Sequence, residues 1–439
     1  MFQQNVRYRA TAYAVSDGSS ALTYRELDIA SDQSATSLAR LGAAAGTVVA
    51  VGLPFSLELP VAAVALLKLR AIYLPLDDGL PADRLSFMLA KSAAKFLITS
   101  PGSKLDSAPL PEGVNKIYAH ELNAAASQDS TNATFTAAPR APSEGAYICF
   151  TSGSTGYPKG VLIREQALFG LLSDAIPRFG VNGNARTALN TSISFDISLA
   201  EIWMTLCGGG ELIASGSSKP LVGDKLARFI EGRNVTHLAV TPSVLASVKP
   251  RKLATLKCII ACGEACPDSL ASNWASGRRF FIAYGPTEAT IYATAARCRP
   301  GKKVTIGRAM GHIRTYVLDQ EQNPVAAGDP GELCLGGCGV ASGYLDADQE
   351  ANRRFLKWAP HDREADWIYR TGDLVREDKD GNLLFLGRLD HQVKIRGHRI
   401  ELEEIEATAK RLPHVRDAAL CVDETEGNEL ICFVVMEPG

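Results

Sequence analysis

Residues 151–160 combine hydroxyl groups, three glycines and one cation in a single short segment. Gly153, Gly156 and Gly160 carry no Cβ, so backbone N–H groups there can approach a ligand closely. Lys159 adds a mobile point charge. Such a set of groups is suited to holding a polyphosphate. The segment lacks the Gly-Lys-Ser/Thr ending of a Walker loop, and a Ser/Gly-rich surface turn is the alternative interpretation.

Two further groups of polar residues follow later in the chain. Tyr284 and Glu288 come directly after an apolar run, so an aromatic ring that could stack on a base lies near a carboxylate that could hold Mg²⁺. A Gly-Pro turn with a solvent-facing acid is the alternative. Asp373 follows a glycine and is suited to accept hydrogen bonds from ribose hydroxyls, with Arg388 as the opposing donor. Each of these groups alone is typical of a charged turn. Their joint occurrence, in this order and together with the glycine-rich segment 151–160, favours a nucleotide site.

The elements that position these groups indicate an α/β protein. Helix-like periodicity at residues 27–41 alternates with β-branched runs, which favours a parallel or mixed sheet. A loose surface connection is expected over residues 101–145. After Val317 the chain has shorter strands and the hairpin signal Asp380-Gly381, typical of a β-rich subdomain. The predicted strands are residues 48–51, 96–99, 147–150, 237–240, 257–261, 280–283, 393–396 and 430–436, and a helix is predicted to begin near Glu401.

Length and composition limit the class of protein. With 439 residues, two or more domains are expected. The net charge of -2 provides no basic field for nucleic acid or an anionic membrane. Lys68 and Arg70 interrupt the apolar run over residues 61–74, which is too short to span a bilayer. The ten cysteines show no repeated CxxC spacing, so reduced thiols and a cytoplasmic location are expected.

Eight segments occur in the order of known family motifs, and the chain resembles the adenylate-forming superfamily, within it the adenylation domains of nonribosomal peptide synthetases. In the second segment, Lys68-Leu69-Arg70 replaces the usual Lys-Ala-Gly. The segments are residues 22–27, 67–77, 151–160, 195–198, 284–288, 331–345, 369–374 and 387–406.

The resemblance implies a large N-terminal core of mixed and parallel sheets with helices and a β-rich subdomain, over residues 1–389. An incomplete small α+β domain is expected over residues 390–439, which turns about a hinge at Asp390 between two half-reactions.

The resemblance also implies a substrate carboxylate that attacks the α-phosphorus of ATP and releases pyrophosphate, followed by attack of a carrier protein's phosphopantetheine thiol. ATP and Mg²⁺ are the implied cofactors. Lys159, Glu288 and Lys394 would be catalytic, with Glu288 as the metal ligand and Lys394 on the thioester-forming side; a solvated strand lysine is the alternative for Lys394. Nucleotide-binding residues would be Thr151, Ser152, Gly153, Ser154, Thr155, Gly156, Gly263, Glu264, Tyr284, Gly285, Thr287, Asp373 and Arg388.

Asp196 indicates which acid is loaded. By resemblance it pairs with the α-ammonium of an amino acid; a helix N-cap before the apolar run 197–206 is the alternative. The other implied pocket positions carry no second charge, so a large aliphatic or aromatic side chain is expected. They are Ile197, Ala200, Ala239, Ile260, Cys262, Ala283, Ile291 and Tyr292.

The expected partners are the carrier and condensation domains of a parent synthetase. Family members continue into a lysine-bearing segment that would lie beyond Gly439, so low activity is expected of these residues alone. Trimming from a larger synthetase, or interruption by a domain such as a methyltransferase, would explain this end. Two other functions stay open. An acyl- or aryl-CoA ligase or a carboxylic acid reductase module is disfavoured by Asp196, and a non-catalytic nucleotide-binding protein is disfavoured by Lys159, Glu288, Asp373 and Arg388.

Overall fold

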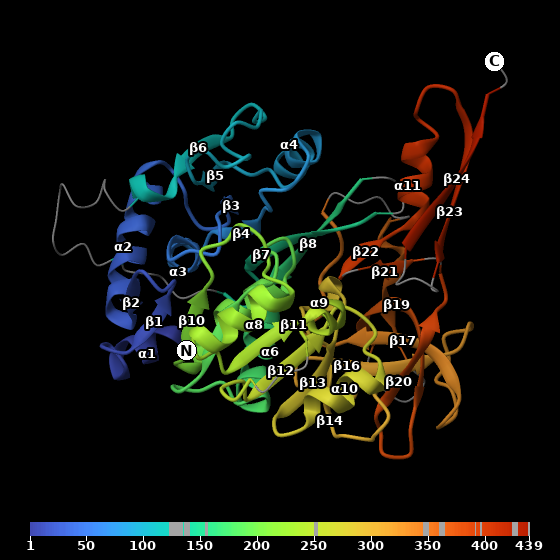
Figure 1. Ribbon diagram of the computed structural model, residues 1–439. Coiled ribbons are helices and arrows are strands. Elements are labelled where there is room, and N and C mark those ends of the chain that lie inside the picture. The colour runs from blue at the N-terminus through green and yellow to red at the C-terminus, as the bar shows by residue number, and fades with distance from the viewer. Residues whose placement is uncertain are drawn as a thin grey trace.

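The computed structural model describes residues 1–122, 135, 141–153, 157–249, 253–345, 351–359, 365–390, 392–395, 397–423 and 429–437. In Figure 1 the N-terminal part in blue, the middle part in green and yellow, and the C-terminal part in orange and red lie beside one another. The described residues form three larger sheets and two hairpins. The predicted α/β class, with a β-rich subdomain and a small C-terminal unit, is confirmed.

The first sheet carries the segment 151–160 near one edge. Its strand order is β6-β5-β3-β4-β7-β8, and every described neighbouring pair is parallel except β7 with β8. Buried β-branched residues fill β3, as expected for a strand covered on both faces. The strands are β3 (Val48–Gly52), β4 (Ile72–Pro75), β5 (Phe96–Thr99), β6 (Asn115–Tyr118), β7 (Gly145–Thr151) and β8 (Lys159–Arg164).

Strand β6 corrects one prediction. Residues 101–145 are not a loose connection throughout, because Asn115–Tyr118 pair in parallel with β5 at the sheet edge. Only Ile117 of this strand is buried, so the sequence shows no alternating apolar pattern there. Residues 123–134 and 136–140 of the same stretch lie outside the described residues.

The second sheet supplies four of the nine predicted substrate residues, namely Ala239, Ile260, Cys262 and Ala283. Its order is β15-β14-β13-β12-β11-β9-β10-β1-β2, with parallel pairing in the centre and antiparallel strands at both edges. The strands are β1 (Tyr13–Ser16), β2 (Ala21–Thr23), β9 (Arg186–Leu189), β10 (Glu211–Ala214), β11 (His237–Val240), β12 (Cys258–Cys262), β13 (Arg279–Tyr284), β14 (Thr294–Cys298) and β15 (Arg308–Ala309).

One hydrophobic core connects both sheets through buried helices. Helices α3 (Glu58–Leu69) and α7 (Ile197–Gly208) are apolar on nearly all sides, which fits their burial. Helix α2 (Tyr24–Arg40) begins at Thr23, whose side chain forms a capping box with Glu26. The remaining core helices are α1 (Phe2–Tyr8), α4 (Ala82–Lys91), α6 (Glu165–Phe179), α8 (Gly223–Gly232), α9 (Pro242–Ser247) and α10 (Asp268–Ala275).

The β-rich part is an antiparallel sheet in the order β16-β17-β19-β18, with β20 paired to β19. The predicted turn at Asp380-Gly381 joins β19 to β20, and Gly381 has a φ of 75°. Of the two 3₁₀ turns, η2 (Ala351–Arg354) contacts β19 of this sheet, whereas η1 (Thr287–Ala289) contacts β8 of the first sheet. The strands are β16 (Arg314–Leu318), β17 (Pro330–Gly336), β18 (Phe355–Trp358), β19 (Asp366–Glu377) and β20 (Leu383–Arg388).

The chain after Asp390 forms a hairpin of β21 (Val393–Ile395) and β22 (His398–Ile400), helix α11 (Leu402–Ala409), and a hairpin of β23 (Val415–Asp423) and β24 (Glu429–Met436). Helix α11 packs on β23, and both project from the body in Figure 1. Among the described residues, no strand of this segment pairs with the three larger sheets.

Two global features accompany the fold. Within the described ranges, every helix is too short or too polar to cross a membrane. All ten cysteines are free, and Cys149, Cys258, Cys262 and Cys334 are buried.

Candidate functional site

The segment 151–160 is the tip of the β7–β8 hairpin. Thr151 and Lys159 face each other across the hairpin, and the Thr151 hydroxyl donates to the Lys159 carbonyl at 3.5 Å. A Cβ on Gly153 would lie 2.2 Å from the Tyr157 carbonyl oxygen, so the turn requires glycine there. The predicted phosphate ligands Ser154, Thr155 and Gly156 lie outside the described residues.

Two side chains near this turn, those of Ser152 and Lys159, are suited to bind an anion. The Ser152 hydroxyl is buried and has no hydrogen-bond partner among the described residues. The Lys159 ammonium lies 5.3 Å from the centroid of the Tyr344 ring, and burial lowers its pKa. An unpartnered buried hydroxyl beside a partly desolvated ammonium is suited to receive a phosphate oxygen.

Asp196 lies at the start of α7 and is only 7% exposed. It occupies the N-cap position, but in the described structure its side chain makes no capping hydrogen bond, and its Oδ2 atom has no partner. Burial raises the pKa of this carboxyl to about 6, against an opposing hydrogen bond from Thr287. The N-cap interpretation therefore does not explain why a carboxylate is buried here.

The residues predicted to surround Asp196 come together on adjacent elements. Ala239, Ile260 and Cys262 lie on neighbouring strands, and strand register pairs Ala239 with Ile260 and Cys262 with Ala283. Burial raises the pKa values of the Cys262 thiol and the Tyr292 hydroxyl, and the charge of Asp196 adds to the rise in both. The remaining members are Ile197 and Ala200 on α7, and Ile291 after η1; all of the set except Ile197 are buried.

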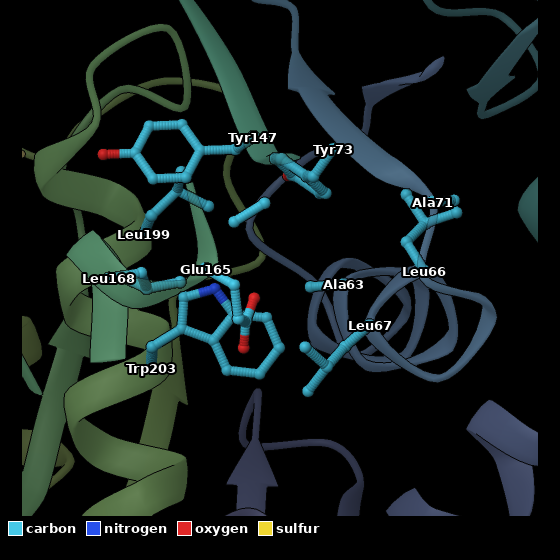
Figure 2. Close-up of a pocket in the computed structure, with 11 residues that line it drawn as sticks. Ala63, Leu66, Leu67, Ala71, Tyr73, Tyr147, Glu165, Leu168, Leu199 and Trp203 are labelled. Carbon is cyan, nitrogen blue, oxygen red and sulfur yellow. The ribbon is translucent and has the colours of Figure 1, made fainter. Parts of the chain in front are cut away.

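A small cavity of about 20 Å³ lies elsewhere, between helices α3, α6 and α7 and strands β4 and β7. Figure 2 shows that Trp203, Leu199 and Ala63 surround it, with the Tyr147 hydroxyl directed away from it. This volume holds about one water molecule. None of the predicted substrate residues lines this cavity.

A continuous polar chain connects the predicted adenine and ribose residues. The Tyr284 hydroxyl donates to Asp373, and Arg388 Nη1 donates to Asp373 Oδ1 at 2.6 Å. Arg388 also donates to Asp390, which Arg354 Nη2 contacts at 2.7 Å. Burial would raise the pKa of Asp390, but these two guanidinium groups lower it to about 2. The nucleotide residues and the expected hinge thus share one hydrogen-bond network.

The remaining predicted nucleotide residues that the structure describes here follow the ends of strands β12 and β13. Gly263 has a φ of 86°, and the Glu264 carboxylate accepts hydrogen bonds from the Ser243 amide at 2.9 Å and hydroxyl at 2.6 Å. A Cβ on Gly285 would lie 2.4 Å from the Ile291 carbonyl oxygen, so the chain after β13 packs too closely for another residue. Thr287 begins the 3₁₀ turn that contains Glu288.

Glu288 is fully buried and faces a cation. Arg399 Nη1 lies 3.1 Å from both carboxylate oxygens, and the Tyr344 hydroxyl donates to Oε1 at 2.6 Å. Burial would raise the pKa of Glu288, but Arg399 and Tyr344 outweigh it and lower that pKa. Carboxylate oxygens are the ligands that Mg²⁺ prefers in proteins, so Glu288 has the chemistry of a metal ligand, but in this structure Arg399 lies in front of both of its oxygens.

Lys394, on β21, approaches the same site from the C-terminal segment. Its ammonium lies 5.9 Å from the centroid of the Tyr284 ring, and burial lowers its pKa. Lys394 is therefore not a fully solvated strand lysine.

The structure adds Arg399, Tyr344 and Arg354 to the site. Tyr344 and Arg399 lie within the segments 331–345 and 387–406, whereas Arg354 lies between two segments. The motif pattern did not reveal their partners, because those partners are distant in sequence: Arg399 and Glu288 are 111 residues apart.

Fold and site define a class of protein. The described residues combine an α/β core, the glycine-bearing β7–β8 hairpin, and the buried carboxylates of Asp373 and Glu288. The family of AMP-binding enzymes matches residues 2–345, and the chain belongs to this family. It is an adenylation domain of the adenylate-forming superfamily.

Curated relatives support this assignment. The chain is 39% identical over 419 residues to phosphinothricin tripeptide synthetase PhsC of Streptomyces viridochromogenes, covering 95% of this chain and 38% of that protein. It is 35% identical over 449 residues to novobiocin biosynthesis protein H of Streptomyces niveus, covering 100% of this chain and 74% of that protein. The chain thus spans well under half of the first synthetase.

Solved structures agree. An artificially fused adenylation–PCP di-domain, NpsA-ThdA from Klebsiella oxytoca, matches with a TM-score of 0.90 and 26% identity, covering 99% of this chain and 87% of that one. The four-domain nonribosomal peptide synthetase AB3403, bound to AMP and glycine, matches with a TM-score of 0.78 and 28% identity, covering 100% of this chain and 32% of that one.

Proposed function

We propose that this domain activates an amino acid with ATP to an aminoacyl-adenylate and pyrophosphate, and then delivers it to the phosphopantetheine thiol of a carrier domain. The observation that carries the proposal is the buried, unpartnered Oδ2 atom of Asp196. A carboxylate held in this way is stabilised by a cation. The α-ammonium of an amino acid supplies one; a fatty or aryl acid does not.

The nucleotide would be held by residues around the β7–β8 tip and the Tyr284–Asp373–Arg388 chain. Ser152 and Lys159 would contact the β- and γ-phosphates, together with Thr151, Gly153 and the undescribed Ser154, Thr155 and Gly156. Asp373 and Arg388 would hold the ribose; Tyr284, Gly263, Glu264, Gly285 and Thr287 would border the adenine.

Glu288 would bind Mg²⁺, supported by the Tyr344 hydroxyl that orients its carboxylate. When bound, the ion would neutralise phosphate charge. Lys159, with its partly buried ammonium, would add a second positive charge beside the same phosphates.

The proposed amino acid has a large aliphatic or aromatic side chain. Ala200 and Ala239 are small and buried, and the implied pocket positions other than Asp196 carry no charged side chain. The nearby Glu201 carboxylate accepts hydrogen bonds from Asn190 and Thr191. A charged side chain would lack a counter-ion there. Tyr292 would form the far wall.

Residues 1–389 would form the catalytic core, and residues after the hinge Asp390 a small unit that presents Lys394 to the thiol-transfer side. The proposed partners are the carrier and condensation domains of a synthetase, with a methyltransferase as a further neighbour. The match to an adenylation–PCP di-domain supports the carrier. Ten free cysteines support a reducing cytoplasmic compartment.

A panel assay tests the proposal. Pyrophosphate exchange into ATP is measured with twenty amino acids and, for the best of them, with the matching acid that lacks the α-amino group. Exchange that requires the amino group supports the proposal. Equal exchange with the deaminated acid, or exchange with fatty or aryl acids alone, would contradict it.

A further inference from the structure

The guanidinium of Arg399 lies where a cation bound to Glu288 would lie. Arg399 is on β22, in the segment after Asp390, whereas Glu288 is in the 3₁₀ turn after β13. The distance from Nη1 to each carboxylate oxygen is 3.1 Å, so the nitrogen is equidistant from the two oxygens. This is the position from which one cation satisfies both oxygens at once.

The surroundings of Glu288 leave little room for a second cation. Its side chain is 0% exposed, and the Tyr344 hydroxyl occupies Oε1 from another side. Mg²⁺ binds carboxylate oxygens at about 2.0–2.1 Å. An ion at that distance on the open side of the carboxylate would meet the guanidinium, and the two positive charges would repel each other in a buried site.

A neighbouring carboxylate also favours the guanidinium over a second cation. Glu401 contacts Arg399 itself, 3.8 Å from Nε. Lys159 and Arg354 add further positive charge to the region. The Glu288 carboxylate can therefore neutralise either the Arg399 guanidinium or a metal ion, but not both at once.

We propose that Arg399 is an internal counter-cation which replaces Mg²⁺ at Glu288, so that docking of the β21–β22 hairpin and binding of the metal–nucleotide exclude each other. The inference rests on the proposed role of Glu288 as the metal ligand. It assigns Arg399 a positioning role: the hairpin docks when the ion has left with its phosphates and undocks when the ion returns.

Several contacts dock the described part of the C-terminal segment, and within it the hydrogen bonds to the proposed metal ligand come from Arg399. Arg84 on α4 pairs with Glu404 on α11, and the Arg411 guanidinium lies 5.7 Å from the centroid of the Tyr157 ring. Arg84→Gln is therefore a matched control, because it removes an interaction with the same segment without touching Glu288.

Binding at equilibrium must be coupled in both directions if the two cations compete. Loss of the Arg399 charge should strengthen metal–nucleotide binding, and addition of the metal should expose the hairpin. If the docked state is about 90% populated, its removal improves the apparent metal affinity about tenfold.

The test uses Mn²⁺ with an ATP analogue that cannot be cleaved at the α-phosphate. Metal affinity is measured by electron paramagnetic resonance, and amide exchange of peptides spanning β21 and β22 is measured with and without metal at fixed analogue. In the wild type and in Arg84→Gln, metal should increase exchange of the hairpin. In Arg399→Gln, the metal should bind about tenfold more tightly and no longer change that exchange.

Arg399→Lys keeps a cation and should retain the metal response; its complete loss there would overturn the counter-cation assignment. Unchanged exchange of the core strands shows that each variant is folded. Measurable but equal metal affinity in wild type and Arg399→Gln, with the metal response intact, would overturn this inference alone. If neither protein bound the metal–nucleotide, the proposed function would fall and this inference with it.

Discussion

Arg388 donates two hydrogen bonds to the carboxylate of Asp390, from Nε to Oδ1 and from Nη2 to Oδ2, each 2.6 Å long. The third nitrogen, Nη1, binds Asp373 at the same distance. One guanidinium therefore connects the proposed ribose carboxylate to the proposed hinge. Planar bidentate geometry of this kind is specific to arginine.

Arg388→Lys should therefore be far from conservative. A lysine ammonium cannot serve both carboxylates, and loss of a charge-assisted hydrogen bond costs about 1.5–3 kcal/mol. We expect the KM for ATP to rise by roughly ten- to a hundredfold, since RT ln 10 is about 1.4 kcal/mol. Pyrophosphate exchange over a range of ATP concentrations measures it. An unchanged KM for ATP would separate Arg388 from nucleotide binding.

Asp196→Asn should weaken amino-acid binding and leave nucleotide binding intact. Removing one partner of a buried ion pair costs about 3–5 kcal/mol, so the amino-acid KM should rise at least a hundredfold. ATP affinity, measured by calorimetry, should stay within about twofold.

Glu201→Gln is the matched control for Asp196→Asn. Glu201 is on the same helix and fully buried, but its carboxyl accepts hydrogen bonds from Asn190 and Thr191. Burial raises its pKa to about 8, so it is mostly neutral at pH 7 and glutamine resembles it. A comparable loss of amino-acid affinity in both variants would show that any change in α7 has this effect.

The raised pKa of Asp196 predicts two pH dependences. Amino-acid binding needs the ionised carboxylate, so kcat/KM for the amino acid should fall as pH drops through about 6, and this limb should be absent in Asp196→Asn. The folded protein also holds the proton more tightly than the unfolded chain does. The wild-type carboxyl therefore destabilises the fold as pH rises from about 4 to 6.

Thermal unfolding measures the second dependence. Asp196→Asn should be more stable than the wild type at pH 8, by on the order of 1–3 kcal/mol, and this difference should disappear near pH 4. A constant difference across this range would mean that the asparagine acts through packing and not through the charge.

Much of the site could be predicted because its residues follow strands that the sequence marks clearly. The β-branched or apolar runs at β5 and β11 have the predicted limits. The resemblance implied that Ala239, Cys262 and Ala283 share one pocket, and they lie on three adjacent parallel strands whose carboxyl ends meet at one edge of the sheet.

The interactions that join distant segments could not be predicted. No local pattern encodes the contact between Arg399 and Glu288, because it depends on how the segment after Asp390 packs on the core. The edge strand β6 was missed for a related reason: its backbone pairs with β5, while its side chains are mostly exposed.

Ala239→Leu should narrow the proposed side-chain pocket. Ala239 is 4% exposed and pairs with Ile260 in the sheet. Three added carbon atoms exclude the largest side chains, and shape discrimination of about 1–3 kcal/mol per methylene shifts kcat/KM toward smaller amino acids by about tenfold or more. The amino-acid panel measures the ranking, and ATP affinity shows that the variant is folded. An unchanged ranking would remove Ala239 from the pocket.

Lys394→Ala should separate the two half-reactions. The Lys394 ammonium faces the Tyr284 ring from β21, in the same docked segment that brings Arg399 to Glu288. A docked segment of this kind is proposed to serve thiol transfer, so loading of a carrier domain should fall by about a hundredfold or more, the cost typical of losing a positioning group. Pyrophosphate exchange should change by less than about threefold, because the metal–nucleotide state releases the hairpin.

Lys410→Ala is the control, since Lys410 belongs to the same segment but pairs with the exposed Asp417 at 2.7 Å. Equal losses in both half-reactions of Lys394→Ala would assign the lysine to nucleotide binding instead.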